Sequence, residues 1–219
     1  MELNKNTIII TIISFVGIFA FLTGAYMLTN KAETTVFEEV NKILPSDHLK
    51  WSPEKKNILV EYSDFQCPAC KNYHEIISQQ IEASGSANFD ITKKVTFVYR
   101  NFPLFQIHQH AYAAASAAEA AGKQNKFFEM GDALFNTQDE WSKSSNVQAE
   151  FIKIATNLKL DIEKFKKDMG SKDIKDKVDT DMRSGEKAGL DSTPTFYLNG
   201  KKVTVTSFEE FIKVLKSVQ

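Results

Sequence analysis

Short apolar runs alternate with amphipathic stretches in the first half of the chain. Residues 57–65, NILVEYSDF, are apolar and rich in β-forming side chains, which predicts a strand. Residues 69–83, ACKNYHEIISQQIEA, repeat apolar side chains at helical spacing, and residues 94–102, KVTFVYRNF, predict a second buried strand. The order strand, helix, strand predicts a βαβ unit within residues 57–106.

A long region without strand signals follows at residues 107–188. It opens with the alanine-rich stretch HAYAAASAAEAAGK and continues with apolar side chains three and four residues apart, so we expect a helical insertion. The strand pattern returns in residues 189–219, where TPTFYLNGKKVTV predicts a hairpin that turns at its Asn-Gly pair. Ser207 and Glu210 form a capping box before a last amphipathic helix. The pattern therefore predicts an α/β fold, βαβ followed by ββα, with an inserted helical domain.

The N-terminal residues have a different character from the rest of the chain. Residues 7–28, TIIITIISFVGIFAFLTGAYML, contain no charged side chain, and as a helix they would span about 33 Å, enough for a bilayer core. We expect residues 1–30 to be a transmembrane anchor, with a cleaved signal segment as the alternative. Either way we expect the rest of the chain to lie outside the cytoplasm, as a single-pass cell-membrane protein or as a secreted one. Residues 31–56 are polar and contain prolines, so we interpret them as a linker.

The net charge and the cysteine content limit the functions that the chain can have. The net charge is −1, which lacks the basic field that nucleic-acid binding requires. The chain has two cysteines, Cys67 and Cys70, in the sequence CPAC. A bridge between residues this close closes a very small loop and adds little stability, so the pair indicates redox chemistry. Outside the cytoplasm, such a cysteine pair can also persist as a disulfide.

The position of the pair predicts different roles for the two sulfurs. If Cys67 begins the helix, Pro68 lies at its first position, where a missing N–H costs nothing. The partial positive charge of a helix N-terminus favours a thiolate, so we expect the pKa of Cys67 to be lowered. Cys70, one turn later, should be more buried and act as the resolving thiol.

A zinc site is the alternative for this cluster. Cys67, Cys70 and His74 have a spacing that supplies three ligands, whereas a structural zinc site usually has four. No other histidine pairs with the cluster in sequence, so we predict no metal. We interpret His74 as a partly exposed helix residue, and we expect no catalytic role for His108 or His110.

Taken together, these motifs resemble the DsbA-like thiol–disulfide oxidoreductases of the thioredoxin-fold superfamily, in a membrane-anchored form. The resemblance covers about residues 55–219 and rests on CPAC after a strand, the helical insertion and GLDSTPTFYLNG. It implies a thioredoxin fold. It also implies a cis proline at Pro194 that faces the disulfide, with Thr193, Pro68 and Ala69 contacting the substrate.

The resemblance also implies a role for Glu61, six residues before Cys67 on the first strand. Relatives carry an acidic residue here that moves protons to and from the second cysteine. The alternative is an edge-strand glutamate in water. A central strand would instead bury both of its faces.

The function implied is the introduction of disulfide bonds into reduced exported proteins by dithiol–disulfide exchange. It requires no cofactor, and the family implies reoxidation by a membrane quinone-linked partner. A tethered reductase or isomerase would use the same cysteines in the opposite direction. A non-enzymatic module that binds partners through the helical insertion is a further alternative.

Overall fold

The computed structural model describes residues 13–23, 36–83 and 85–218, which fall into two units, residues 1–35 and 36–219. In the first unit, residues 13–23 are helical, and the rest of the predicted anchor at residues 7–28 lies outside the described residues. Within the described part, none of the helices has both the length and the apolar character needed to cross a bilayer.

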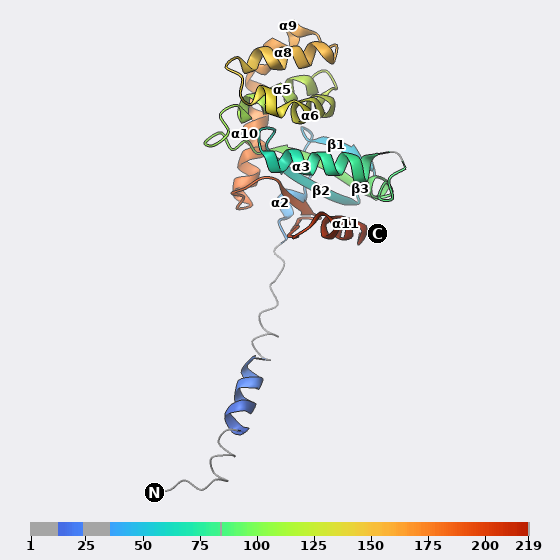
Figure 1. Ribbon diagram of the computed structural model, residues 1–219, viewed down its shortest axis with the longest axis vertical. Helices are drawn as coiled ribbons and strands as arrows, with labels where there is room; N and C mark the ends of the chain where they lie inside the picture. The colour runs from blue at the N-terminus through green and yellow to red at the C-terminus, as the bar shows by residue number, and fades with distance from the viewer. Residues whose placement is uncertain (1–12, 24–35, 84, 219) are drawn as a thin grey trace. The chain divides into compact units, whose positions relative to one another are not determined.

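The second unit combines a mixed sheet with helices (Figure 1). Its strands are β1 (His48–Trp51), β2 (Asn57–Ser63), β3 (Val95–Asn101), β4 (Thr195–Leu198) and β5 (Lys201–Lys202). Its helices are α2 (Glu38–Asn41), α3 (Pro68–Ile77), the π-helical η1 (Ser78–Glu82), α4 (Ile91–Lys94), α5 (Ala111–Gly122), α6 (Phe127–Asn136), α7 (Gln138–Trp141), α8 (Val147–Asn157), α9 (Ile162–Met169), α10 (Lys172–Lys187) and α11 (Phe208–Lys216). The α/β fold predicted from the sequence, with its helical insertion, is confirmed.

The sheet has the order β1-β3-β2-β4-β5. β2 runs parallel to β3 and antiparallel to β4, so β2 is a central strand. All residues of β2 and β3 are buried, which explains their nearly continuous apolar sequences. The predicted hairpin turns at Asn199 and Gly200, whose φ angles of 51° and 75° suit a type I′ turn.

Each face of the sheet supports a separate apolar core. On one face, Leu59 and Phe97 pack with the cysteines, α3, α11 and the helical insertion. On the other face, Val60 and Tyr62 pack with α2 and the residues that follow α10. Side chains of β2 alternate between these cores, so Glu61 shares the α3 face with Leu59.

Residues 31–56 were interpreted above as a linker. From residue 36 onward that prediction is wrong, because this part of the chain forms regular secondary structure. It contains α2 and the edge strand β1, which pairs antiparallel with β3. The reason is tertiary: β1 has only four residues, all half-buried, so its sequence lacks a clear period-two pattern. Its pairing with β3 defines the strand.

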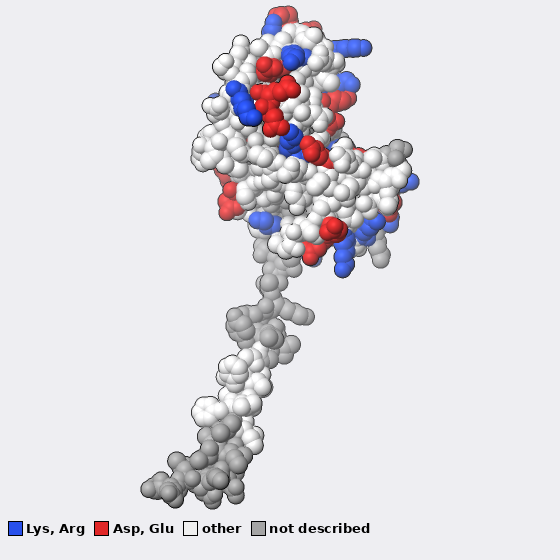
Figure 2. Space-filling view, in the orientation of Figure 1, with Lys and Arg blue, Asp and Glu red and all other residues white. Residues whose placement is uncertain are grey.

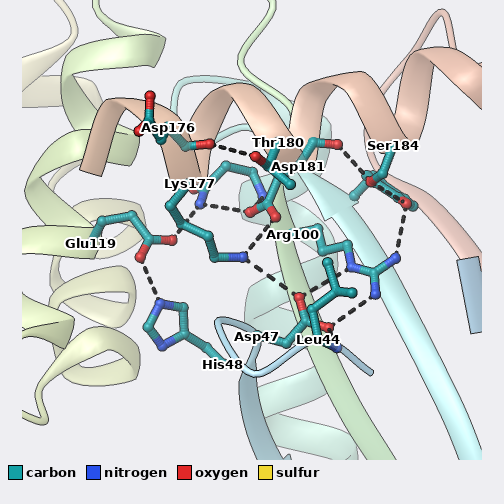
Figure 3. Close-up of polar contacts among 12 residues, drawn as sticks. Leu44, Asp47, His48, Arg100, Glu119, Asp176, Lys177, Thr180, Asp181 and Ser184 are labelled. Atoms are coloured by element: carbon teal, nitrogen blue, oxygen red, sulfur yellow. Dashed lines mark hydrogen bonds and ion pairs between the residues drawn. The ribbon is translucent and has the colours of Figure 1, made fainter. Parts of the chain in front are cut away.

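Buried charges join this N-terminal segment to β3 and α10 (Figure 3). The Arg100 guanidinium donates to both carboxylate oxygens of Asp47, at 3.3 and 2.9 Å, and both side chains are essentially inaccessible. Lys177 of α10 lies 3.5 Å from the same carboxylate. Arg100 also donates to the Val40 and Lys42 carbonyls, at 3.0 and 2.6 Å. These bonds satisfy a cation that would be costly to bury alone.

The network continues from α10 to α5 and β1 (Figure 3). Lys177 donates to Asp181 at 2.6 Å, and Asp181 accepts the backbone N–H of Asn101 at 3.0 Å. The Asn101 amide donates to Glu119 of α5 at 2.7 Å, and Glu119 lies 2.8 Å from His48 Nε2. Burial raises the pKa of Asp181 to about 6, with Lys177 opposing the shift. Side chains from the N-terminal segment, the sheet and the insertion thus complete one another's hydrogen bonds.

Candidate active site

The cysteine pair lies where the central strand β2 gives way to α3. Cys67 is the N-cap residue of α3, and Pro68 occupies the first helical position, as predicted. The Cys67 N–H donates to the Asp64 carbonyl at 3.0 Å, which closes a tight turn between strand and helix. The sulfur of Cys67 therefore lies at a helix N-terminus, where unpaired N–H groups favour negative charge.

Cys67 is the more exposed and the more acidic of the two thiols. It is 7% exposed, whereas Cys70 is fully buried, and both are free thiols. A hydrogen bond from the Cys70 thiol, with further donors from Thr193 and the backbone of Ala69 and Cys70, lowers the pKa of Cys67 to about 5 against the opposing effect of burial. A thiolate at this position is the species that attacks disulfides.

Cys70 has the opposite environment. Burial, followed by its interaction with Cys67, raises the pKa of Cys70 well above its usual value. The Asp64 N–H points at its sulfur, 3.4 Å away. The two sulfurs therefore divide the chemistry: Cys67 carries charge readily, and Cys70 does so only when its surroundings supply a donor.

Thr193 and Pro194 lie against the pair, from a part of the chain distant in sequence. The Thr193–Pro194 peptide bond is cis, as the family resemblance implied, and the Thr193 carbonyl lies 3.4 Å from Cys67 Sγ. Pro68 and Ala69 are exposed beside it. The three predicted substrate-contact residues, Thr193, Pro68 and Ala69, thus lie with Pro194 beside Cys67, and their contact with substrate remains a prediction.

Glu61 is buried at the centre of the sheet and not at its edge. It pairs with Tyr99 of β3 and Phe196 of β4 and is 5% exposed. Burial raises the pKa of Glu61 to about 7, against the opposing effects of Ser63 and then Lys50. A carboxyl with this pKa can exchange its proton near neutral pH, and its role as a proton shuttle remains a prediction.

A small cavity of about 20 Å³ touches Glu61. Lys50, His74 and Asp132 also line it, and this volume suffices for about one water molecule. His74 is half-buried and stacks on Phe135, and burial lowers its pKa to about 4. In the described ranges, no group of three or more His, Cys, Asp and Glu side chains is arranged to hold a metal ion.

The helical insertion holds the strand–helix turn in place. Gln138 of α7 donates to the carbonyls of Phe65 and Cys67, at 2.8 and 3.1 Å. Gln66 accepts the backbone N–H of His110 at 2.7 Å. Neither glutamine was predicted from the sequence, because a single glutamine in a turn or a short helix gives no local sign of such a contact.

Asp64 is a third residue of the site that was not predicted from the sequence. Its side chain is buried and accepts a hydrogen bond from His108 Nδ1 at 2.7 Å. The available signal was a charged residue directly at the end of an apolar strand, three positions before Cys67. His108, for which no catalytic role was expected, therefore reaches the active-site turn through Asp64.

Comparisons with known families support the fold. A family model described as Thioredoxin matches residues 45–217. Among solved structures, alpha-DsbA1 from Wolbachia pipientis superimposes with a TM-score of 0.66 at 24% identity, covering 83% of this chain and 95% of that chain. At this identity the likeness establishes the thioredoxin-like fold alone.

Curated relatives give a mixed picture of activity. The Na(+)/H(+) antiporter NhaA 1 of Mycobacterium sp. (strain KMS) is 36% identical over 160 residues, covering 71% of this chain and 24% of that protein. The present chain thus spans about a quarter of that relative's length. The probable disulfide bond formation protein D of Bacillus cereus is 31% identical over 146 residues, covering 65% of each protein.

The acidity of Cys67 leads to a first prediction. In the reduced protein, the thiolate absorbance and the rate of alkylation of Cys67 should rise with a midpoint near pH 5. Cys70→Ala removes the thiol that donates to Cys67 and should move this midpoint upward. Mass spectrometry should find the alkyl group on Cys67 and not on Cys70 at neutral pH. A wild-type midpoint at the ordinary cysteine value of about 8.5 would contradict this account.

Burial of Glu61 leads to a prediction about stability. Its pKa in the folded protein, about 7, exceeds the value of 4.5 expected when unfolded, so the folded state binds the proton more tightly. The free energy of unfolding should therefore fall as pH rises from 4.5 through 7, by about 3 kcal/mol. Glu61→Gln should remove this loss and be more stable than wild type at pH 8.

This test uses denaturant unfolding of the disulfide-bonded protein, in which Cys67 does not titrate. Glu54→Gln, at an exposed glutamate, is the matched control and should keep the wild-type pH dependence. Identical pH dependence in wild type and Glu61→Gln would show that Glu61 is not the group responsible.

Proposed function

The chain belongs to the thioredoxin family, and we propose that it is an extracytoplasmic thiol–disulfide oxidoreductase that introduces disulfide bonds into reduced exported proteins. The observation that carries this proposal is the asymmetric pair: an acidic Cys67 at the start of α3 and a buried Cys70 one turn later. The relative named as a disulfide bond formation protein supports the same class of reaction.

The proposed reaction conserves atoms and electrons. A substrate thiolate attacks Cys67 Sγ, the Cys67–Cys70 bond breaks, and Cys70 leaves and takes up a proton. A second substrate thiolate then attacks the substrate sulfur of the mixed disulfide, and Cys67 leaves as a thiolate. The substrate loses two electrons and gains a disulfide, and the enzyme is left as a dithiol.

The two pKa values suit these steps. Cys67 is a good leaving group because its thiolate is stable near pH 5. Cys70 needs a proton when it leaves, because its own pKa lies well above the usual value. Glu61, on the α3 face of the sheet and with a pKa near 7, is the proposed donor. The same group would accept the proton when the pair is reoxidised.

The stability of the reduced form supports the proposed direction of electron flow. Stabilising the Cys67 thiolate stabilises the dithiol relative to the disulfide, which makes the disulfide a stronger oxidant. The alternative, a reductase or isomerase using the same residues, requires a more stable disulfide. Turnover as an oxidase requires an electron acceptor, for which a membrane quinone-linked partner is the proposed class.

The surface beside the pair supports contact with polypeptides. Phe105 and Ile107, in the loop between β3 and α5, are 49% and 74% exposed. Figure 2 shows largely uncharged surface over this loop, beside the N-terminal end of α3. Apolar side chains exposed together are typical of interaction sites, and unfolded substrates offer apolar segments. The backbone at Thr193 would pair with an extended substrate segment.

We also propose that residues 1–30 anchor the protein in the cell membrane, with the catalytic unit outside the cytoplasm. The support is the uncharged sequence of residues 7–28. A secreted form released by signal cleavage is the alternative.

The redox potential tests the proposed direction. Equilibration of the Cys67–Cys70 pair with glutathione should give a potential above about −200 mV, within the range of disulfide oxidants. A value near that of thioredoxin, about −270 mV, would overturn the oxidase proposal in favour of the reductase. Cys67→Ser should show no equilibrium with glutathione, because the attacked sulfur is gone.

Fractionation tests the anchor. The full chain, expressed with its own N-terminus, should remain with membranes after washing at high salt, and its intact mass should include residues 1–30. A soluble product whose sequence begins near Tyr26 would contradict the anchor and support the cleaved signal.

A further inference from the structure

We infer that Asp64 and His108 are positioning residues that hold a backbone N–H against the sulfur of Cys70 and thereby promote its departure and attack. The inference rests on the proposed disulfide exchange and adds two residues to it. Neither side chain contacts a sulfur; both act through the Asp64 amide.

The backbone of Asp64 contacts both cysteines. Its N–H donates to Cys70 Sγ at 3.4 Å, and its carbonyl accepts the Cys67 N–H at 3.0 Å. The amide of this one residue is therefore the donor that serves Cys70, whereas the donors that act on Cys67 Sγ come from other residues.

The side chain of Asp64 anchors that backbone. It is 1% exposed, and Oδ1 accepts the Gln66 N–H at 2.7 Å. Oδ2 accepts the Leu104 N–H at 2.9 Å and bonds His108 Nδ1 at 2.7 Å. An ionised carboxylate can only accept hydrogen bonds, so Nδ1 of His108 carries the proton. His108 thus ties the loop after β3 to the active-site turn through a charge-assisted bond.

The Asp64 N–H matters because Cys70 is buried. When a thiol attacks Cys67, negative charge develops on Cys70 as the disulfide breaks, and the same charge is present when Cys70 attacks in the reverse direction. Burial disfavours that charge, as the raised pKa of Cys70 records. A fixed N–H directed at the sulfur stabilises the transition state at a place that bulk water does not reach. If the turn at residues 64–67 moves, Cys70 loses this hydrogen-bond donor, although both cysteines are still present.

His108→Leu tests the inference, because leucine fills similar volume but donates no hydrogen bond. The oxidised protein is mixed with excess reduced glutathione, and the rate at which the Cys67–Cys70 disulfide opens is followed by stopped flow. We expect opening to slow by about tenfold, the effect of losing one hydrogen bond of about 1.4 kcal/mol. Alkylation of Cys67 in the reduced protein should change less than about twofold, because its donors come from Cys70, Thr193 and the start of α3.

Three further variants separate positioning from general destabilisation. His108→Asn keeps an N–H close to the place of Nδ1 and should restore most of the opening rate. Asp64→Asn has the shape of the wild-type residue but loses an acceptor, and it should slow opening as His108→Leu does. The double variant should be no slower than either single variant, because both act through one amide. Gln106→Ala, exposed on the same loop, is the matched control and should open at the wild-type rate.

Wild-type opening rates in both His108→Leu and Asp64→Asn, with thermal unfolding showing that the proteins are folded, would overturn the inference. Equal slowing of opening and of Cys67 alkylation would also overturn it, since that pattern indicates general loosening. If His108→Leu does not fold, the opening rate of Asp64→Asn is used as the test instead. Failure of the proposed function shows differently: the wild-type pair would then not exchange with glutathione at all, or would equilibrate near −270 mV.

Discussion

Buried polar groups in the turn at residues 64–67 constrain the rest of the structure. The turn joins a fully buried strand to a helix, so water cannot satisfy its backbone. The insertion and the loop that leads into it supply the partners instead: Gln138 for two carbonyls, the backbone at His110 for Gln66, and His108 for Asp64. The helical domain is therefore part of the active site, although it contributes no sulfur and no proton-transferring group.

That constraint explains why two cysteines one helical turn apart behave differently. Cys67 lies at the end of the turn, where the start of α3 and Thr193 provide donors to a thiolate. Cys70 lies inside, next to the face that carries Glu61, with the Asp64 N–H directed at its sulfur. Burial raises the pKa of both Cys70 and Glu61, so Cys70 favours its protonated form, whereas Cys67 readily carries a charge.

The opposite side of the sheet depends on charge and close packing. Arg100 and Asp47 are both inaccessible, and Lys177 joins them from α10 (Figure 3). Removing one member of such a set would leave an unpaired charge in the interior, which costs several kcal/mol. Gly185 lets α10 approach the sheet, because a side chain there would lie 2.7 Å from Phe102. The helix that returns from the insertion is thus held to β3 close to the active-site end of the strands.

From β2 onward, local sequence was sufficient for the order of the main elements and for the place of the cysteines. The periodicity and composition of the sequence identify β2, α3 and β3. Pro68 suits the first position of a helix, and the Asn-Gly pair suits a tight hairpin turn. Each of these signals spans only a few neighbouring residues. The burial of Glu61 needed the sheet order, since only a central strand covers both faces. The bonds from His108 to Asp64 and from Gln138 to Cys67 join residues 44 and 71 apart, and β1 is a strand because of its pairing with β3. Such contacts leave no periodic trace in the chain, because packing of whole elements brings their partners together, and only the tertiary structure decides them.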